Sequence, residues 1–151
     1  MEIIEANKFH TDVIIEMLKR YRSHTPIKFM EQCDNIEYIK KLLGYVFAGR
    51  GIVLLAMKDD KAIGMIIGFV DQSIWDPEVC VLKELAYWVD EEHRGSTAGY
   101  RLIKKYNDIA NSWILNGRIK TATISKMVNS PDLDYSKFGY KKCEETWSLG
   151  V

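Results

Sequence analysis

The fold is decided by the stretch LAYWVDEEHRGSTAGY, residues 85–100, in which a strand pattern, a turn and a helix pattern follow one another. Residues 79–89 are apolar and rich in β-branched and aromatic side chains, which predicts a central strand. Residues 94–99 are mostly small, which is typical of a turn. Apolar residues at helical spacing then continue to Asn116 and Gly117, where we expect a long helix to end.

The turn between this strand and this helix has the properties of an anion-binding site. The first N–H groups of a helix have no partner within the helix, and the helix dipole favours negative charge there. Small side chains let an anion approach, while Arg94 adds a guanidinium and Ser96 and Thr97 add hydroxyl donors. The pattern predicts a pyrophosphate cradle on the amides of residues 95–100; the alternative is an ordinary Gly/Ser-rich helix start. The absence of GxGxxG and of GxxxxGKS/T disfavours a dinucleotide fold and a P-loop hydrolase.

Outward from this junction, the chain alternates between strand and helix patterns. Asp34 and Glu37 have capping-box spacing for a second helix, and Thr25-Pro26 ends the first. The order β, α, α, β, β, β, α, β, short α, β predicts one α/β (α+β) domain over residues 1–151. The expected elements are a strand at 2–6, helices at 11–24 and 36–48, strands at 52–57, 62–70 and 79–89, a long helix that begins in the turn at 94–99 and ends at Asn116 and Gly117, a strand at 119–125, a loop or short helix at 129–138 and a strand at 140–149.

Composition narrows the class of protein further. Of the 151 residues, 47% are hydrophobic and 28% charged, as in a globular domain with its own core. The 21 Lys and Arg balance the 21 Asp and Glu, which argues against nucleic-acid and membrane partners. Cys33, Cys80 and Cys143 are widely spaced, so we expect reduced thiols and a cytoplasmic location. The 3 histidines are dispersed, so we expect no metal site.

Three motifs, in this order, resemble the GNAT family of N-acetyltransferases. RGSTAG at residues 94–99 is similar to the family signature Q/R-x-x-G-x-G/A, and residues 89–95 resemble the run that leads into it. YSKFGY at residues 135–140 resembles the family's Y-x-K-x-G-F/Y. Thr97 stands at the middle glycine of the signature, and Asn129 precedes Tyr135 by one residue fewer than in the family. The resemblance implies a mixed, mostly antiparallel central sheet flanked by helices.

The resemblance also implies an activity, namely direct transfer of an acetyl group from acetyl-CoA to a primary amine. The pantetheine arm would pair with the exposed backbone of the central strand, and the pyrophosphate would lie on the amides that follow Arg94. The residues implied to bind the donor are Tyr87, Trp88, Val89, Arg94, Gly95, Ser96, Thr97, Ala98, Gly99, Tyr100 and Asn129.

Two residues are candidates for catalysis. Glu84, on the central strand, is the candidate base that takes a proton from the amine; its alternative is an ion pair with a surface Lys or Arg. Tyr135 matches the family's general acid, but a phenol with a pKa near ~10 is a weaker acid than a thiol near ~8.5. We therefore expect it to hydrogen-bond the departing thiolate; its alternative is packing over Phe138 and Tyr140.

The acceptor is a small-molecule or peptide amine that the sequence leaves open. Acidic loop residues would attract a cationic amine, and the family is compatible with a homodimer. The contrasting interpretation is a protein of the same fold that binds coenzyme A, or another protein, without catalysis; Thr97 and the Asn129 spacing favour it. The acidic residues are Asp71, Asp76, Glu78, Asp132 and Asp134.

Overall fold

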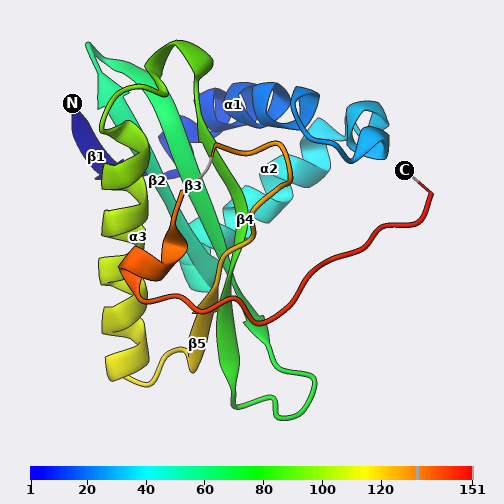
Figure 1. Ribbon diagram of the computed structural model, residues 1–151, viewed down its shortest axis with the longest axis vertical. Helices are drawn as coiled ribbons and strands as arrows, with labels where there is room; N and C mark the ends of the chain where they lie inside the picture. The colour runs from blue at the N-terminus through cyan, green and yellow to red at the C-terminus, as the bar shows by residue number, and fades with distance from the viewer. Residues whose placement is uncertain (132, 151) are drawn as a thin grey trace.

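The computed structural model describes residues 1–131 and 133–150, which form one five-stranded sheet with helices on both faces (Figure 1). The strands lie in the order β1-β2-β3-β4-β5. The first four pair antiparallel and β5 pairs parallel with β4, so the expected mixed, mostly antiparallel sheet is confirmed. The strands are β1 (Glu2–Glu5), β2 (Gly51–Lys58), β3 (Lys61–Gln72), β4 (Cys80–Val89) and β5 (Thr121–Thr123).

Two helices cover one face of the sheet and a third covers the other (Figure 1). α1 (Thr11–Ser23) and α2 (Ile36–Tyr45) pack against Val53 and Leu55, whereas α3 (Ala98–Leu115) packs against Ile52 and Leu54. Because successive strand residues point to opposite faces, a strand buried on both sides is continuously apolar. Short helical turns connect these elements: η1 (Lys8–His10), η2 (Lys28–Gln32), η3 (Val46–Arg50, a π turn), η4 (Glu91–His93) and η5 (Tyr135–Phe138).

The β2–β3 hairpin turns at the predicted position. Asp59 and Asp60 both have positive φ, at 50° and 60°, which gives the connection the twist that a two-residue hairpin requires. None of the helices in the described residues is long and apolar enough to cross a membrane.

A β-bulge interrupts the pairing of β3 with β4 near the middle of the sheet. Ile67 pairs with Ala86, but the next residue, Gly68, pairs with Glu84, so Leu85 has no opposite residue. A bulge bends its strand and changes the direction of the neighbouring side chains, and bulges are frequent beside active sites. The bulge therefore sets the orientation of Glu84.

Two predicted elements differ in the structure. The cap of α2 is Asn35, whose side chain accepts the Tyr38 N–H, because Asp34 instead pairs with Arg22. The predicted strand at 140–149 is wrong: the chain is extended without strand pairing, and Trp147 is 87% exposed. Four charged side chains between 141 and 145 leave little apolar area to bury, and β5 has only three residues.

Candidate active site

The separation of β4 from β5 creates the opening at which the site lies. The two strands pair only from Val81 to Lys83, opposite Thr121 to Thr123, and then diverge. At the point of divergence the Ser125 N–H donates to the Glu84 carboxylate at 3.2 Å. A side chain thus replaces the next backbone pair, and the edge of β4 beyond it is open toward β5.

Glu84 lies in a poorly solvated position at this point. Burial raises the pKa of its carboxyl from 4.5 to about 7, and the hydrogen bond from Ser125 opposes the rise. Within the described residues its carboxylate accepts the Ser125 amide, which holds it at the edge of β4, and a pairing with a surface lysine or arginine stays an alternative. A carboxylate that titrates near neutrality can accept a proton at physiological pH.

Aromatic side chains surround this carboxylate. Burial, followed by the nearby charge of Glu84, raises the pKa of Tyr21 to about 12. Burial followed by the charges of Tyr135 and Glu84 raises the pKa of Tyr87. These phenols are protonated at neutral pH, so they are neutral neighbours of the Glu84 charge.

The first turn of α3 offers unpaired backbone donors, as the sequence predicts. In residues 1–131 and 133–150, the amides of Gly95, Thr97, Gly99 and Tyr100 donate to no protein acceptor. Together with the helix dipole they form a site that fits a diphosphate group. Ser96 differs from expectation, because its hydroxyl donates to the His93 carbonyl and accepts the Ala98 N–H. It closes the turn internally and is not available to an anion.

Gly99 fixes the distance between this helix and β4. The Tyr87 hydroxyl donates to the Gly99 carbonyl at 2.7 Å, and a Cβ at Gly99 would lie 2.9 Å from the same hydroxyl. A side chain at this position would push the helix away from the strand. Gly95, by contrast, faces open space.

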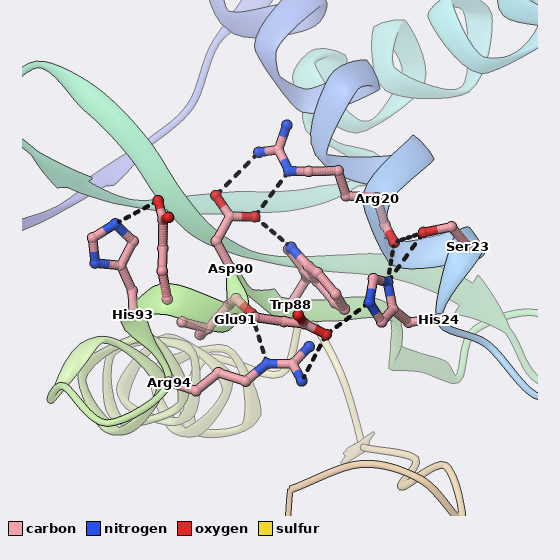
Figure 2. A network of polar contacts seen from close by, with 10 residues as sticks. Arg20, Ser23, His24, Trp88, Asp90, Glu91, His93 and Arg94 are labelled. Carbon is pink, nitrogen blue, oxygen red and sulfur yellow. Dashed lines mark hydrogen bonds and ion pairs between the residues drawn. The ribbon is translucent and has the colours of Figure 1, made fainter.

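Arg94 folds back onto β4 instead of facing the free amides. Its guanidinium lies beside Trp88 (Figure 2), 4.6 Å from the ring centroid. Its Nε donates to the Val89 carbonyl at 3.0 Å. Glu91 lies 3.9 Å from its Nη1. Two predicted donor-binding groups, Arg94 and the Val89 carbonyl, are therefore bonded to each other. A ligand must separate them or use other atoms.

A second set of contacts ties the end of β4 to the end of α1. Asp90 accepts two hydrogen bonds from Arg20, at 2.9 and 3.2 Å, and one from the Trp88 indole at 2.8 Å (Figure 2). Local patterns carry no signal for this pairing, since Arg20 and Asp90 lie 70 residues apart.

His24, just after α1, extends these contacts. Its Nε2 lies 2.8 Å from the Glu91 carboxylate, and its backbone carbonyl accepts the Asn129 side-chain amide. Asn129, predicted to bind the donor, therefore bonds to the α1 corner in this structure. Glu91 follows β4 and Asn129 follows β5. His24 therefore connects the segments that follow these two diverging strands.

Tyr135 lies at the start of η5, half-buried, with its ring 6.3 Å from that of Tyr140. Burial, followed by the charge of Glu84, raises the pKa of Tyr135 to about 12. This direction opposes proton donation, so the phenol is a better hydrogen-bond donor than acid. Its packing on Tyr140 is also present, so the two interpretations are compatible.

The acidic loops are largely engaged in local contacts. Asp71 pairs with Lys83 at 3.1 Å, Asp76 accepts the Glu78 N–H, and Asp134 caps η5. Asp132 lies outside the described residues. No group of three or more His, Cys, Asp or Glu with metal-binding geometry was found among the residues described.

Comparison with known proteins agrees with this geometry. The model of the acetyltransferase (GNAT) family matches residues 14–140. Among curated proteins no match was found.

Three solved structures illustrate the similarity of fold. A predicted acetyltransferase from Clostridium acetobutylicum, solved with acetyl-CoA, has a TM-score of 0.77 at 11% identity, covering 99% of this chain and 95% of that one. An aminoglycoside acetyltransferase from an uncultured soil metagenomic sample, in complex with sisomicin, has a TM-score of 0.69 at 16% identity, covering 99% and 93%. A ribosomal-protein-alanine N-acetyltransferase from Brucella melitensis has a TM-score of 0.63 at 13% identity, covering 100% of both chains.

Proposed function

Because the chain belongs to the acetyltransferase (GNAT) family, we propose that it is an N-acetyltransferase that moves an acetyl group from acetyl-CoA to a primary amine. One observation carries the proposal: a carboxylate whose pKa burial raises to about 7 lies where β4 and β5 separate. A base matched to neutral pH at an open strand edge is suited to deprotonating an amine.

The donor would bind along the open edge of β4 and over the first turn of α3. The amides of Gly95, Thr97, Gly99 and Tyr100 would receive the diphosphate. Arg94 would then leave Glu91 and the Val89 carbonyl for the phosphate oxygens, which suit a guanidinium as well as a carboxylate does. The backbone of Tyr87, Trp88 and Val89 would pair with the pantetheine arm.

Glu84 would take up the proton that the amine must lose. An alkyl ammonium has a pKa near ~10.4, so most of the acceptor is protonated at neutral pH and needs a base. The Glu84 carboxylate takes one proton from the ammonium, directly or through water, and the free amine nitrogen then bonds to the thioester carbonyl carbon. As the carbon–sulfur bond breaks, the nitrogen gives up its second proton to solvent. Coenzyme A leaves as the thiol once its sulfur is protonated.

Tyr135 would stabilise the departing sulfur by hydrogen bonding and keep its own proton. Its pKa, raised to about 12, makes full transfer to a thiolate unfavourable. A neutral hydroxyl directed at developing negative charge still lowers the barrier. The thiol proton then comes from solvent.

The acceptor class remains a primary amine of a small molecule or of a peptide. Related folds include an aminoglycoside acetyltransferase and a ribosomal-protein-alanine N-acetyltransferase, so both kinds of amine belong in a screen. We expect a cytoplasmic protein that binds neither nucleic acid nor membrane, and a homodimer is compatible with the family.

A second candidate, a coenzyme A-binding protein without catalysis, is favoured by the bond between Arg94 and Val89. The experiment that separates the two is a thiol-release assay with acetyl-CoA and a panel of polyamines, aminoglycosides, amino acids and peptides. Our proposal expects amine-dependent release that Glu84→Gln abolishes. Binding of acetyl-CoA without release for any amine would favour the second candidate.

A further inference from the structure

Two tyrosine hydroxyls are buried on the α3 side of the sheet and make no hydrogen bond within the described residues. Tyr106, on α3, is 0% exposed, and the hydroxyl of Tyr140, after η5, is also inaccessible. The two phenols are close enough that Tyr140 contributes to raising the pKa of Tyr106. A buried hydroxyl without a hydrogen-bond partner destabilises the fold, whereas phenylalanine would fill the same space without that cost.

The hydroxyl of Tyr106 lies directly below the strand pair that carries Glu84. A Cβ at Gly68 would lie 2.7 Å from this oxygen, so the missing side chain makes room for it. Gly68 is the residue paired with Glu84 across β3 and β4, at the bulge. Cross-strand partners project their side chains to the same face, so the carboxylate and the phenol share one side of the sheet.

We propose that Tyr106 and Tyr140 are positioning residues for Glu84: their hydroxyls and its carboxylate hold ordered water that hydrogen-bonds the carboxylate from inside the protein. A buried water molecule needs two to four polar partners: the Glu84 carboxylate and the Tyr106 hydroxyl supply two, and Tyr140, which lies close to Tyr106, supplies a third. The catalytic consequence rests on the proposed function. The water would orient the carboxylate toward the opening between β4 and β5 and stabilise its charge.

The titratable groups whose pKa is raised by the charge of Glu84 come from several elements around it. They are Tyr21 on α1, Tyr87 on β4, Tyr106 on α3 and Tyr135 on η5, and the Ser125 amide after β5 bonds the carboxylate itself. Only the Ser125 amide bonds the carboxylate directly within the described residues. Loss of the internal donors should therefore change its titration measurably.

The test uses Tyr106→Phe and Tyr140→Phe, which remove one oxygen each and keep the rings. A donor to a carboxylate favours the charged form, so its removal raises the pKa. We expect the acidic limb of the kcat/KM profile to move up by about 0.5–1 pH unit, a three- to ten-fold loss below pH 7. Tyr38→Phe, at an exposed phenol on α2, is the matched control and should leave the profile unchanged.

A second readout separates this inference from the proposed function. NMR titration of the Glu84 side-chain carbon in the full chain reports its pKa without any substrate. An upward shift in both variants supports the inference, even if no amine is acetylated and the proposed function fails. An unchanged Glu84 titration together with a higher melting temperature would show that the hydroxyls are merely unpaired, and would overturn it.

Discussion

The charged side chains at the two ends of the site on β4 differ in their exposure to solvent and in their partners. Near the carboxyl end of the strand, Arg94, Glu91 and His24 form contacts of 2.8–3.9 Å between side chains that are 31–63% exposed. In the middle of the strand, Glu84 has little solvent and one direct hydrogen bond. An exposed ion pair contributes ~0–1 kcal/mol to the free energy of unfolding. Burial of a carboxylate without a cationic partner, by contrast, raises its pKa strongly.

This difference indicates that the two ends of the site have different functions. Exposed ion pairs exchange partners at little cost in free energy, so Arg94, in the loop after β4, can leave Glu91 and bind a phosphate. The buried carboxylate is costly to the fold, and such cost is commonly retained where function requires it.

The largest expected effect is at the buried end, with Glu84→Gln. Removal of a general base lowers turnover by roughly 10²–10⁴-fold. The wild-type rate should rise with pH through about 7, because only the carboxylate accepts the proton. A variant that keeps near-normal turnover would remove Glu84 from the mechanism.

The same variant, which should lower turnover, should increase the free energy of unfolding. The folded pKa is raised above the unfolded value of 4.5, so the folded state prefers the protonated form, and wild-type stability falls as pH rises from 4.5 through about 7. At pH 8, Glu84→Gln should therefore be more stable by up to about 3 kcal/mol, and at pH 4 by little. Denaturant unfolding at both pH values measures this.

A smaller effect on stability is expected at Gly68, whose missing side chain makes room for Tyr106 below the strand pair that carries Glu84. Gly68→Ala would place a Cβ 2.7 Å from the Tyr106 hydroxyl and 2.9 Å from Leu82. Such overpacking costs about 1–3 kcal/mol of unfolding free energy. Gly44→Ala, on α2 with nothing within 4 Å, is the control and should stabilise by about 0.5–1 kcal/mol. Equal behaviour of the two variants would contradict the tight packing around Tyr106.

The smallest effect is expected at the exposed end, with Glu91→Gln. This change removes one of the partners of Arg94, whose Nε still donates to the Val89 carbonyl, and removes a negative charge near the predicted diphosphate site. We expect acetyl-CoA to bind a few-fold more tightly, with the gain disappearing at high salt because exposed charges are screened. Calorimetric titration at two ionic strengths measures it, and Glu92→Gln, at an exposed neighbour, serves as control. Weaker binding in Glu91→Gln would mean that Glu91 supports the ligand-bound loop.

The sequence predicted what short-range patterns determine. The strand–turn–helix junction, the β2–β3 hairpin and the end of α3 at Asn116 and Gly117 agree with the structure. Each depends on residues that are neighbours in the chain, such as Asp59 and Asp60 in their turn.

What the sequence could not predict depends on distant partners or on competition between neighbours. The orientation of Arg94 follows from the position of Trp88 and Glu91, and Asp90 bonds an arginine 70 residues away. Tyr106 belongs to the apolar stripe of α3, so its spacing in the sequence predicts a core residue such as phenylalanine. Nothing in that pattern indicates that its hydroxyl lies below the strand pair that carries Glu84. The segment 140–149, predicted as a strand, has four charged side chains between 141 and 145, and with only three residues in β5 it stays unpaired.

Binding of acetyl-CoA is tested most directly by a thermal melt of the full chain with and without this ligand, with dephospho-CoA as comparator. A ligand at one hundred times its Kd stabilises the folded state by about 2.7 kcal/mol. For a chain of this length we expect acetyl-CoA to increase the Tm by about 5–10 °C. No increase with excess ligand would contradict donor binding at the first turn of α3, and with it acetyl transfer at this site.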